Sequence, residues 1–436
     1  MSTKTSLPQL DISASKPLPL GEAQSSLGTI AEYSSHAQEI AENPGQARRY
    51  KLLKTARSLL PDERIAQCQH NIAPEHRTAV VQVNSITDRA SFRGLIRCDS
   101  PQCPFCSFER SENDRHELSI ALAEAQRMGY FPLMFTFTLS HQVHDRLEDL
   151  RAALRTGFDK VFSGRWYQEF KANWQIVGKI TSSEVTYGKN GWHPHLHILM
   201  FASMDFDLKS LETIRADVSQ RWQSKLKTLG FSANLAHGVD IRYAEADIAD
   251  YIAKYGREPE NPQWGVDTEI AKANVKRAAF GGLTPFQLLG VVAGIQADED
   301  AAMMLLGSAD VETLKKRCAA LFCEFFYAYK GRARIHWGKM RKILDLEVAL
   351  ENFELLNHEE PGETFDVVLI ERGLEWAKVN GAAGKDLRAE LLAVCATKQA
   401  WLVMKFMRGH GIRGEVKLEA FSRLNQIAKD RKEVTQ

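Results

Sequence analysis

The sequence has little net charge, no long hydrophobic run and no internal repeat. The 436-residue chain carries a formal charge of only +1, so a DNA-binding surface would have to be a local basic patch. Its longest apolar stretch, near residues 286–295, is too short to span a bilayer. The N-terminal residues do not combine a basic start with an apolar run, so we expect no secretory signal. We therefore expect a cytoplasmic protein with no membrane partner.

The remaining composition is that of a packed protein with more than one domain. Hydrophobic residues make up 44% of the chain and charged residues 25%. Helical and alternating patterns are mixed along the sequence, which predicts an α+β fold with a central antiparallel sheet flanked by helices. The segments expected to be helical are 48–60, 109–128, 145–172, 205–229, 244–255 and most of the chain beyond 345. The expected strands are 131–139, 174–187, 192–201 and 239–243.

The most informative pattern is an alternation of histidines in the strand expected at residues 192–201. Side chains alternate between the faces of a strand, so His193, His195 and His197 share one face while the residues between them point into a core. Two imidazoles spaced in this way can bind one divalent ion together. The alternation favours a metal or phosphate site over a solvated polar face.

A hairpin brings a carboxylate to the same face. Gly188 to Gly191 form a turn signal between the strands 174–187 and 192–201, which should be neighbours. Glu184 faces His195 in one register of this hairpin and His197 in the other, and lies on the histidine face in both. His195, His197 and Glu184 are therefore candidate ligands of Mn²⁺ or Mg²⁺, with positions left for phosphate oxygens.

A helix expected at residues 244–255 carries two tyrosines on one face. Tyr251 and Tyr255 are one turn apart, and Lys254 lies beside them. Tyrosines with this spacing usually belong to a core. A phenol with a pKa near 10 is a weak nucleophile unless a metal polarises its target, and the histidine strand supplies a candidate metal site.

These strings resemble a known superfamily. His195-Leu-His197 resembles the histidine–hydrophobic–histidine motif of the HUH endonucleases, and WHPHLHIL followed by YIAKY is similar to the rolling-circle replication initiators of plasmids and phages. FTFTLS at 135–140, CDSPQCPFC at 98–106 and GRARIHW at 331–337 resemble further segments of these proteins, in the same order.

The resemblance implies a mechanism and partners. His195 and His197 would bind the catalytic metal, and Tyr255 would attack single-stranded DNA at a replication origin, leaving a 5′-phosphotyrosine and a free 3′-hydroxyl. The plasmid type has a glutamate where this chain has Tyr251, so the pair looks like the two-tyrosine phage type, in which the second tyrosine closes the circle. Host helicase and polymerase would be partners.

A cysteine cluster suggests a second, structural metal. Cys98, Cys103 and Cys106 have spacing typical of zinc ligands, and Cys68 or His70 supplies a fourth. A basic stretch at 330–342 is either a phosphate-binding segment or a solvated loop. We accordingly divide the chain into a disordered or weakly ordered arm (1–47), a cysteine-rich zinc-binding region (48–120), an HUH catalytic nuclease domain (121–345) and a helical C-terminal region (346–436).

Three other functions fit parts of the pattern. A two-tyrosine HUH transposase shares the histidines and the tyrosine pair. A histidine-triad nucleotide hydrolase would use the alternating histidines without a metal. A non-enzymatic zinc-containing DNA-binding protein would use only the cysteines.

Overall fold

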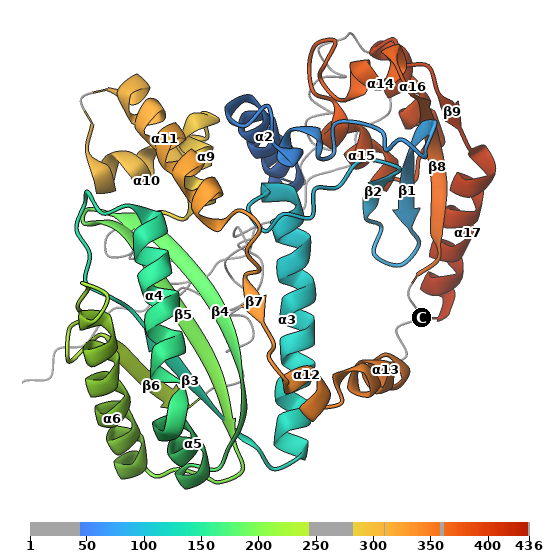
Figure 1. Cartoon of the computed structure of the whole chain (residues 1–436). Helices are drawn as coiled ribbons and strands as arrows, with labels where there is room; N and C mark the ends of the chain where they lie inside the picture. Colours follow the sequence, from blue (N-terminus) through green and yellow to red (C-terminus); the bar gives the residue numbers. More distant parts are fainter. Residues whose placement is uncertain (1–43, 244–281, 309, 358–361, 435–436) are drawn as a thin grey trace, which may run out of the picture.

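A computed structural model describes residues 44–243, 282–308, 310–357 and 362–434 (Figure 1). The strands are β1 (Thr78–Asn84), β2 (Ala90–Arg93), β3 (Phe131–Phe137), β4 (Ile176–Gly188), β5 (Gly191–Ala202), β6 (Val239–Tyr243), β7 (Ile335–His336), β8 (Thr364–Glu371) and β9 (Glu415–Val416). The helices are α2 (Pro44–Leu59), η1 (Arg64–Gln67), α3 (Pro104–Arg127), α4 (Leu147–Val161), α5 (Gly164–Asn173), α6 (Leu208–Lys227), α9 (Pro285–Val292), α10 (Gln296–Leu306), α11 (Val311–Tyr329), α12 (Met340–Ile343), α13 (Leu346–Asn357), α14 (Leu374–Val379), α15 (Arg388–Ala396), α16 (Ala400–Gly409) and α17 (Leu418–Val434).

The histidine strand is the central strand of a five-stranded sheet. The order is β6-β3-β5-β4-β7, and adjacent strands all pair antiparallel. The predicted antiparallel sheet flanked by helices is therefore confirmed, and so is the hairpin between β4 and β5. A central strand is hydrogen-bonded on both edges, which holds its side chains at fixed spacing.

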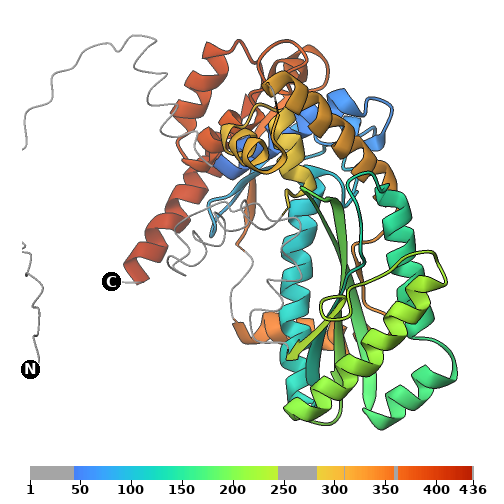
Figure 2. The ribbon, with the colours of Figure 1, turned by 90° about the vertical axis from the view of Figure 1, so that its left-hand side faces the viewer.

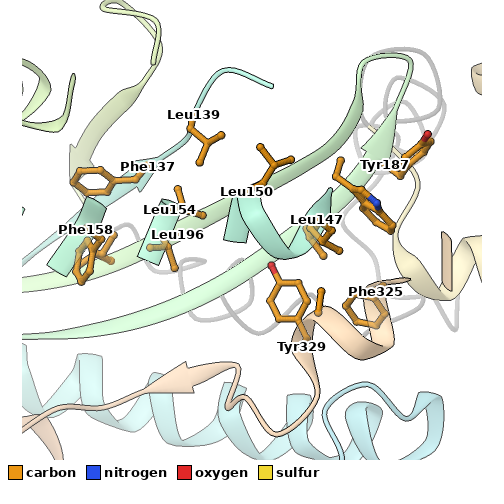
Figure 3. Packing of buried hydrophobic residues seen from close by; sticks show 14 of the residues in the cluster. Phe137, Leu139, Leu147, Leu150, Leu154, Phe158, Tyr187, Leu196, Phe325 and Tyr329 are labelled. Atoms are coloured by element: carbon orange, nitrogen blue, oxygen red, sulfur yellow. The ribbon is translucent and has the colours of Figure 1, made fainter. Parts of the chain in front are cut away.

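Helices cover both faces of this sheet, and Figure 2 shows it between α3 and α6. On one face, α4 places Leu147, Leu150, Leu154 and Phe158 on a single stripe, and Leu154 lies beside Leu196 of β5 (Figure 3). Burying each such side chain contributes about 1.5–3 kcal/mol. The opposite face, which carries the histidines, continues into an apolar cluster formed with α3, α12 and α13.

A second antiparallel sheet joins the two ends of the described chain. Its order is β2-β1-β8-β9, so β1 pairs with a strand from the C-terminal region. Helices α14, α15, α16 and α17 pack with this sheet around a separate core that includes Val81, Ile370, Leu391 and Phe406. Figure 1 shows this part of the molecule at the upper right, away from α6.

Several elements differ from the sequence prediction. The region beyond residue 345 is not only helical, because β8 and β9 lie within it. The helix expected at 145–172 is two helices, since the chain turns at Gly164 with a φ of +69°. Strands β1 and β2 were not anticipated. The four domain boundaries stay a prediction. No helix within the described ranges is both long and apolar enough to cross a membrane.

Candidate metal centres and catalytic residues

The hairpin adopts one of the two registers considered. Gly188 pairs with Gly191, which leaves Lys189 and Asn190 as the turn, and Glu184 lies directly across from His195. The Glu184 side chain extends diagonally along β5 rather than straight across. Its Oε2 lies 2.9 Å from Nε2 of His197. The structure thus brings a carboxylate and an imidazole into contact on the face predicted from the alternation.

His197 is held from two sides. Its side chain is 3% exposed, and its Nδ1 lies 3.2 Å from Oγ1 of Thr136, the cross-strand neighbour on β3. Because Nδ1 faces the hydroxyl, Nε2 is oriented toward Glu184. An imidazole that binds a metal through one nitrogen commonly uses the other in a hydrogen bond of this kind. Sequence reasoning gave Thr136 no role, although the alternation of FTFTLS places it on the histidine face.

His195 lies beside His197 with its ring nearly parallel. The two ring centroids are 6.0 Å apart and the planes differ by 8°. The Nδ1 atom of His195 is buried and has no hydrogen-bond partner among the described residues. Burial lowers the pKa of His195 to about 3, with a further lowering from His193. His195 is thus a neutral imidazole at neutral pH with a buried nitrogen that lacks a partner.

The row of imidazoles extends beyond the pair. The ring of His193 lies 4.0 Å from that of His195 and 4.8 Å from that of His141, and burial lowers the pKa of His193 to about 4. His141 is positioned by a 3.0 Å contact from its Nδ1 to the carbonyl oxygen of Asn190. Neutral imidazoles and one carboxylate form the type of donor set that divalent transition metals prefer.

The candidate ligands do not all converge. Within the described part of the chain, the only group of three or more potential ligands whose atoms lie within 4.8 Å of one another is the cysteine cluster. His197 and Glu184 meet, whereas one ion shared with His195 requires the His195 ring to turn toward them. The types of donor atom therefore fit a divalent ion. Because Nδ1 of His195 has no hydrogen-bond partner among the described residues, no hydrogen bond from that atom would oppose such a rotation.

The predicted nucleophiles Tyr251 and Tyr255, with Lys254, lie outside the described residues. The described chain resumes at residue 282, and the backbone of Leu283 pairs with Tyr187, three residues along β4 from Glu184. The roles of the two tyrosines and the lysine stay predictions.

Four cysteines form a compact buried cluster. Cys68, Cys98, Cys103 and Cys106 are all buried, and Cys68 rather than His70 is the fourth member. The Sγ of Cys106 lies 3.5 Å from that of Cys68 and 3.8 Å from that of Cys98, and Cys103 Sγ lies 3.8 Å from Cys68 Sγ. These separations are too long for disulfides. Four sulfurs at about 2.3 Å from a tetrahedral zinc lie about 3.8 Å apart, so the cluster can hold such an ion.

The electrostatics of the cluster suit a metal. Burial raises the pKa of the Cys103 thiol, whereas hydrogen bonds from the three other thiols lower the pKa of the Cys106 thiol. Buried thiolates are costly without a counter-charge, and a bound cation would supply that charge as the thiols lose their protons.

Three charged side chains of the basic stretch at 330–342 form ion pairs within the chain. Arg334 pairs with Asp114 and Arg341 with Glu117, both on α3, while Lys330 Nζ lies 2.7 Å from Oε1 of Glu63. These three side chains help to attach β7 and α12 to neighbouring helices. These three charges therefore have a packing role, and the phosphate-binding and solvated-loop interpretations of the stretch stay predictions.

Comparison with known proteins identifies the family. Residues 90–352 match the protein family described as "Replication protein". The chain belongs to this family. It is 27% identical over 310 residues to "Protein rep" of Streptomyces lividans, covering 58% of this chain and 65% of that protein. It is also 30% identical over 205 residues to "Protein rep" of Lentilactobacillus hilgardii, and 26% over 210 residues to "Protein rep" of Lactiplantibacillus plantarum.

These relatives are matched only in part. The last two alignments each cover 43% of this chain and 63% of the relative, so the chain spans just under two thirds of the length of all three. No solved structure gives a significant match. The family match confirms the resemblance to replication initiators, while the two-tyrosine feature stays a prediction.

Proposed function

We propose that this chain is a rolling-circle replication initiator of a plasmid or phage, with an HUH endonuclease domain that nicks and rejoins one DNA strand at a replication origin. The observation that carries the proposal is the contact of His197 with Glu184 beside His195, on the central strand of a chain that matches the replication protein family. The family match favours an initiator over the transposase and the nucleotide hydrolase.

His195, His197 and Glu184 would hold a Mn²⁺ or Mg²⁺ ion. Bound there, the ion would polarise the scissile phosphodiester and stabilise the leaving oxygen. His195 would contribute a neutral imidazole, because burial keeps its pKa low, and Thr136 fixes which nitrogen of His197 faces the site. Leu199 and Phe201 follow the histidines on the same face of β5 and belong to an apolar cluster. Their packing would limit access of water to the metal-binding side chains from that end of the strand.

The proposed nucleophile is Tyr255. Its oxygen forms a bond to the phosphorus as the bond from phosphorus to the 3′-oxygen breaks, and the phenolic proton ends on the leaving 3′-oxygen by way of solvent or a base. The products are a 5′-phosphotyrosine and a 3′-hydroxyl that a host polymerase extends while a helicase opens the duplex. Tyr251 would then cut the regenerated junction. Lys254 would offset negative charge on the phosphorane.

The cysteine cluster would bind zinc with a structural role. Its four thiols come from the end of η1, the chain after β2 and the first turn of α3, so one ion would tie three segments together. A closed site with four cysteine ligands has no open position for a substrate. We therefore assign it to folding rather than to strand cleavage.

One assay tests the proposed chemistry. The chain is incubated with single-stranded oligonucleotides tiling the DNA around its gene, with Mn²⁺, and separated on a denaturing gel. We expect a covalent protein–DNA adduct that is absent with EDTA and mostly lost in Tyr255→Phe. An adduct of equal yield in Tyr255→Phe and Tyr251→Phe would refute the assigned nucleophiles, and cleavage without any adduct would refute the tyrosine mechanism.

A further inference from the structure

Two helices of the C-terminal region are joined in the manner of a DNA-reading motif. α15 ends at Ala396 and α16 begins at Ala400, so only Thr397, Lys398 and Gln399 separate them. Lys398 has a φ of +59°, the left-handed conformation that lets the chain reverse within so short a turn. A turn of three or four residues is also the connection between the two helices of helix-turn-helix proteins.

The turn is held rigidly against its neighbours. Lys398 forms an ion pair with Asp88, at the tip of the β1–β2 hairpin, and its carbonyl oxygen accepts a 3.0 Å hydrogen bond from Nδ2 of Asn425 on α17. At the other end of α16, Lys378 Nζ donates a 2.6 Å hydrogen bond to the carbonyl oxygen of Gly411. The orientation of α16 is therefore fixed from both ends.

α16 has one buried and one exposed face. Leu402, Val403, Phe406 and Met407 are buried in the core of the second sheet, as are most side chains of α15. The exposed face consists of Trp401, Met404, Lys405 and Arg408, at the i, i+3, i+4 and i+7 spacing of one helical stripe. Trp401 is 59% exposed and Met404 39%, so this face is apolar as well as basic.

The charge of this segment differs from that of the whole chain. Residues 398–417 contain five lysines and arginines and one acidic residue, whereas the whole chain has a net charge of +1. The exposed face of α17 carries both signs, including Lys429 and Asp430. A rigid helix with basic and aromatic side chains on its exposed face is complementary to a polyanion with base edges in a groove.

We propose that the exposed face of α16 binds the major groove of duplex DNA, as a recognition surface separate from the nicking site. The inference rests on the proposed role at a replication origin and adds which surface of the chain finds it. Arg408 and Lys405 supply cations for guanine edges and phosphates, and Trp401 and Met404 supply apolar contact with thymine methyl groups. Figure 1 shows α16 among the C-terminal helices, far from α6 on the nuclease sheet.

The test compares two charge-matched variants. Duplexes of about 30 base pairs, roughly three helical turns, are selected from a randomised pool on the full chain. Their affinity is then measured by fluorescence anisotropy for Lys405→Gln/Arg408→Gln and for Lys209→Gln/Arg215→Gln, which loses the same charge from exposed positions of α6. We expect the α16 variant to bind at least about tenfold more weakly, with a salt dependence shallower by up to roughly two units. The α6 variant should bind like the unaltered chain, and Trp401→Ala should weaken binding without changing the salt slope.

The measurement is made in EDTA, so its result does not depend on the proposed cleavage. Equal affinity of the α16 variant and the unaltered chain overturns the inference, and so does an equal loss in the α6 variant or failure of the chain to select any duplex. If Trp401→Ala changes the oligomeric state in size-exclusion chromatography instead of DNA affinity, the face is a contact between copies and the inference is wrong. Single-strand cleavage is assayed separately, and its absence would refute the proposed function alone.

Discussion

Replacing Cys106 by serine removes the thiol whose sulfur lies close to two others, at 3.5 Å from Cys68 and 3.8 Å from Cys98. The substitution nearly preserves side-chain volume, so any loss of stability should come from loss of the proposed zinc ion. An ion whose free concentration is about 100 to 1,000 times its dissociation constant stabilises the folded state by about 2.7–4.1 kcal/mol. In a domain of about 150–250 residues, each kcal/mol of lost stability lowers the melting temperature by roughly 2–4 °C. We therefore expect the melting temperature of Cys106→Ser to be lower by about 5–15 °C.

The matched control is Cys323→Ser, which removes a partly buried thiol outside the cluster. Zinc content is measured by mass spectrometry on purified chain, and melting by circular dichroism before and after dialysis against a chelator. The unaltered chain and Cys323→Ser should each hold one zinc and melt lower after chelation, whereas Cys106→Ser should hold none and be insensitive to the chelator. One zinc per chain in Cys106→Ser, with an unchanged melting temperature, would refute the structural role of the cluster.

The other predictions concern the histidine face and the tyrosines. His195→Ala with His197→Ala should abolish cleavage and leave duplex binding intact, as measured by adduct formation and anisotropy; normal cleavage would remove the metal-site interpretation. Thr136→Val should reduce Mn²⁺ affinity or cleavage about 10–100-fold because the hydroxyl orients the imidazole, with recovery in Thr136→Ser, and an unchanged Mn²⁺ titration would contradict this. Tyr255→Phe should lose most initial nicking, while Tyr251→Phe should still form the adduct but produce overlong strands; the reverse pattern would mean that the order of attack is wrong.

The parts of the site that the sequence predicted depend on short-range periodicity. The alternation of His193, His195 and His197 defines one strand face over a few residues, and a glycine-bounded turn fixes its partner strand. Only two registers were compatible with that turn, and both put Glu184 on the same face. Local pattern therefore sufficed for the contact between Glu184 and His197, though not for its diagonal geometry.

The second sheet could not be found in this way. β1 is completed by β8, which lies most of the chain away in sequence and pairs with it from Thr78–Glu371 to Asn84–Thr364, with a register shift between Val81 and Gln82. Nothing in a local window records such a partner, and the apolar run Val367 to Ile370 is too short to distinguish a strand from a buried helical turn. The charges at 330–342 were ambiguous for the same reason, because Asp114 and Glu117 that neutralise two of them lie on a distant helix.

Helix α3 connects the cysteine cluster with the histidine-bearing face of the five-stranded sheet. Cys103 of the cysteine cluster is the N-cap residue of α3 and Cys106 lies in its first turn, and Phe105 between them packs against the cores of both sheets. Farther along, Asp114 pairs with Arg334 beside β7, and Leu118 and Leu122 pack in the apolar cluster on the histidine-bearing side of the sheet. An ion in the cysteine cluster would therefore fix α3 to the segments that precede it, and α3 in turn supports the face on which His197 and Glu184 meet. Loss of that ion should loosen the connection between the four-stranded sheet and the five-stranded sheet before it disturbs either core, because each core is formed mainly by its own strands and helices.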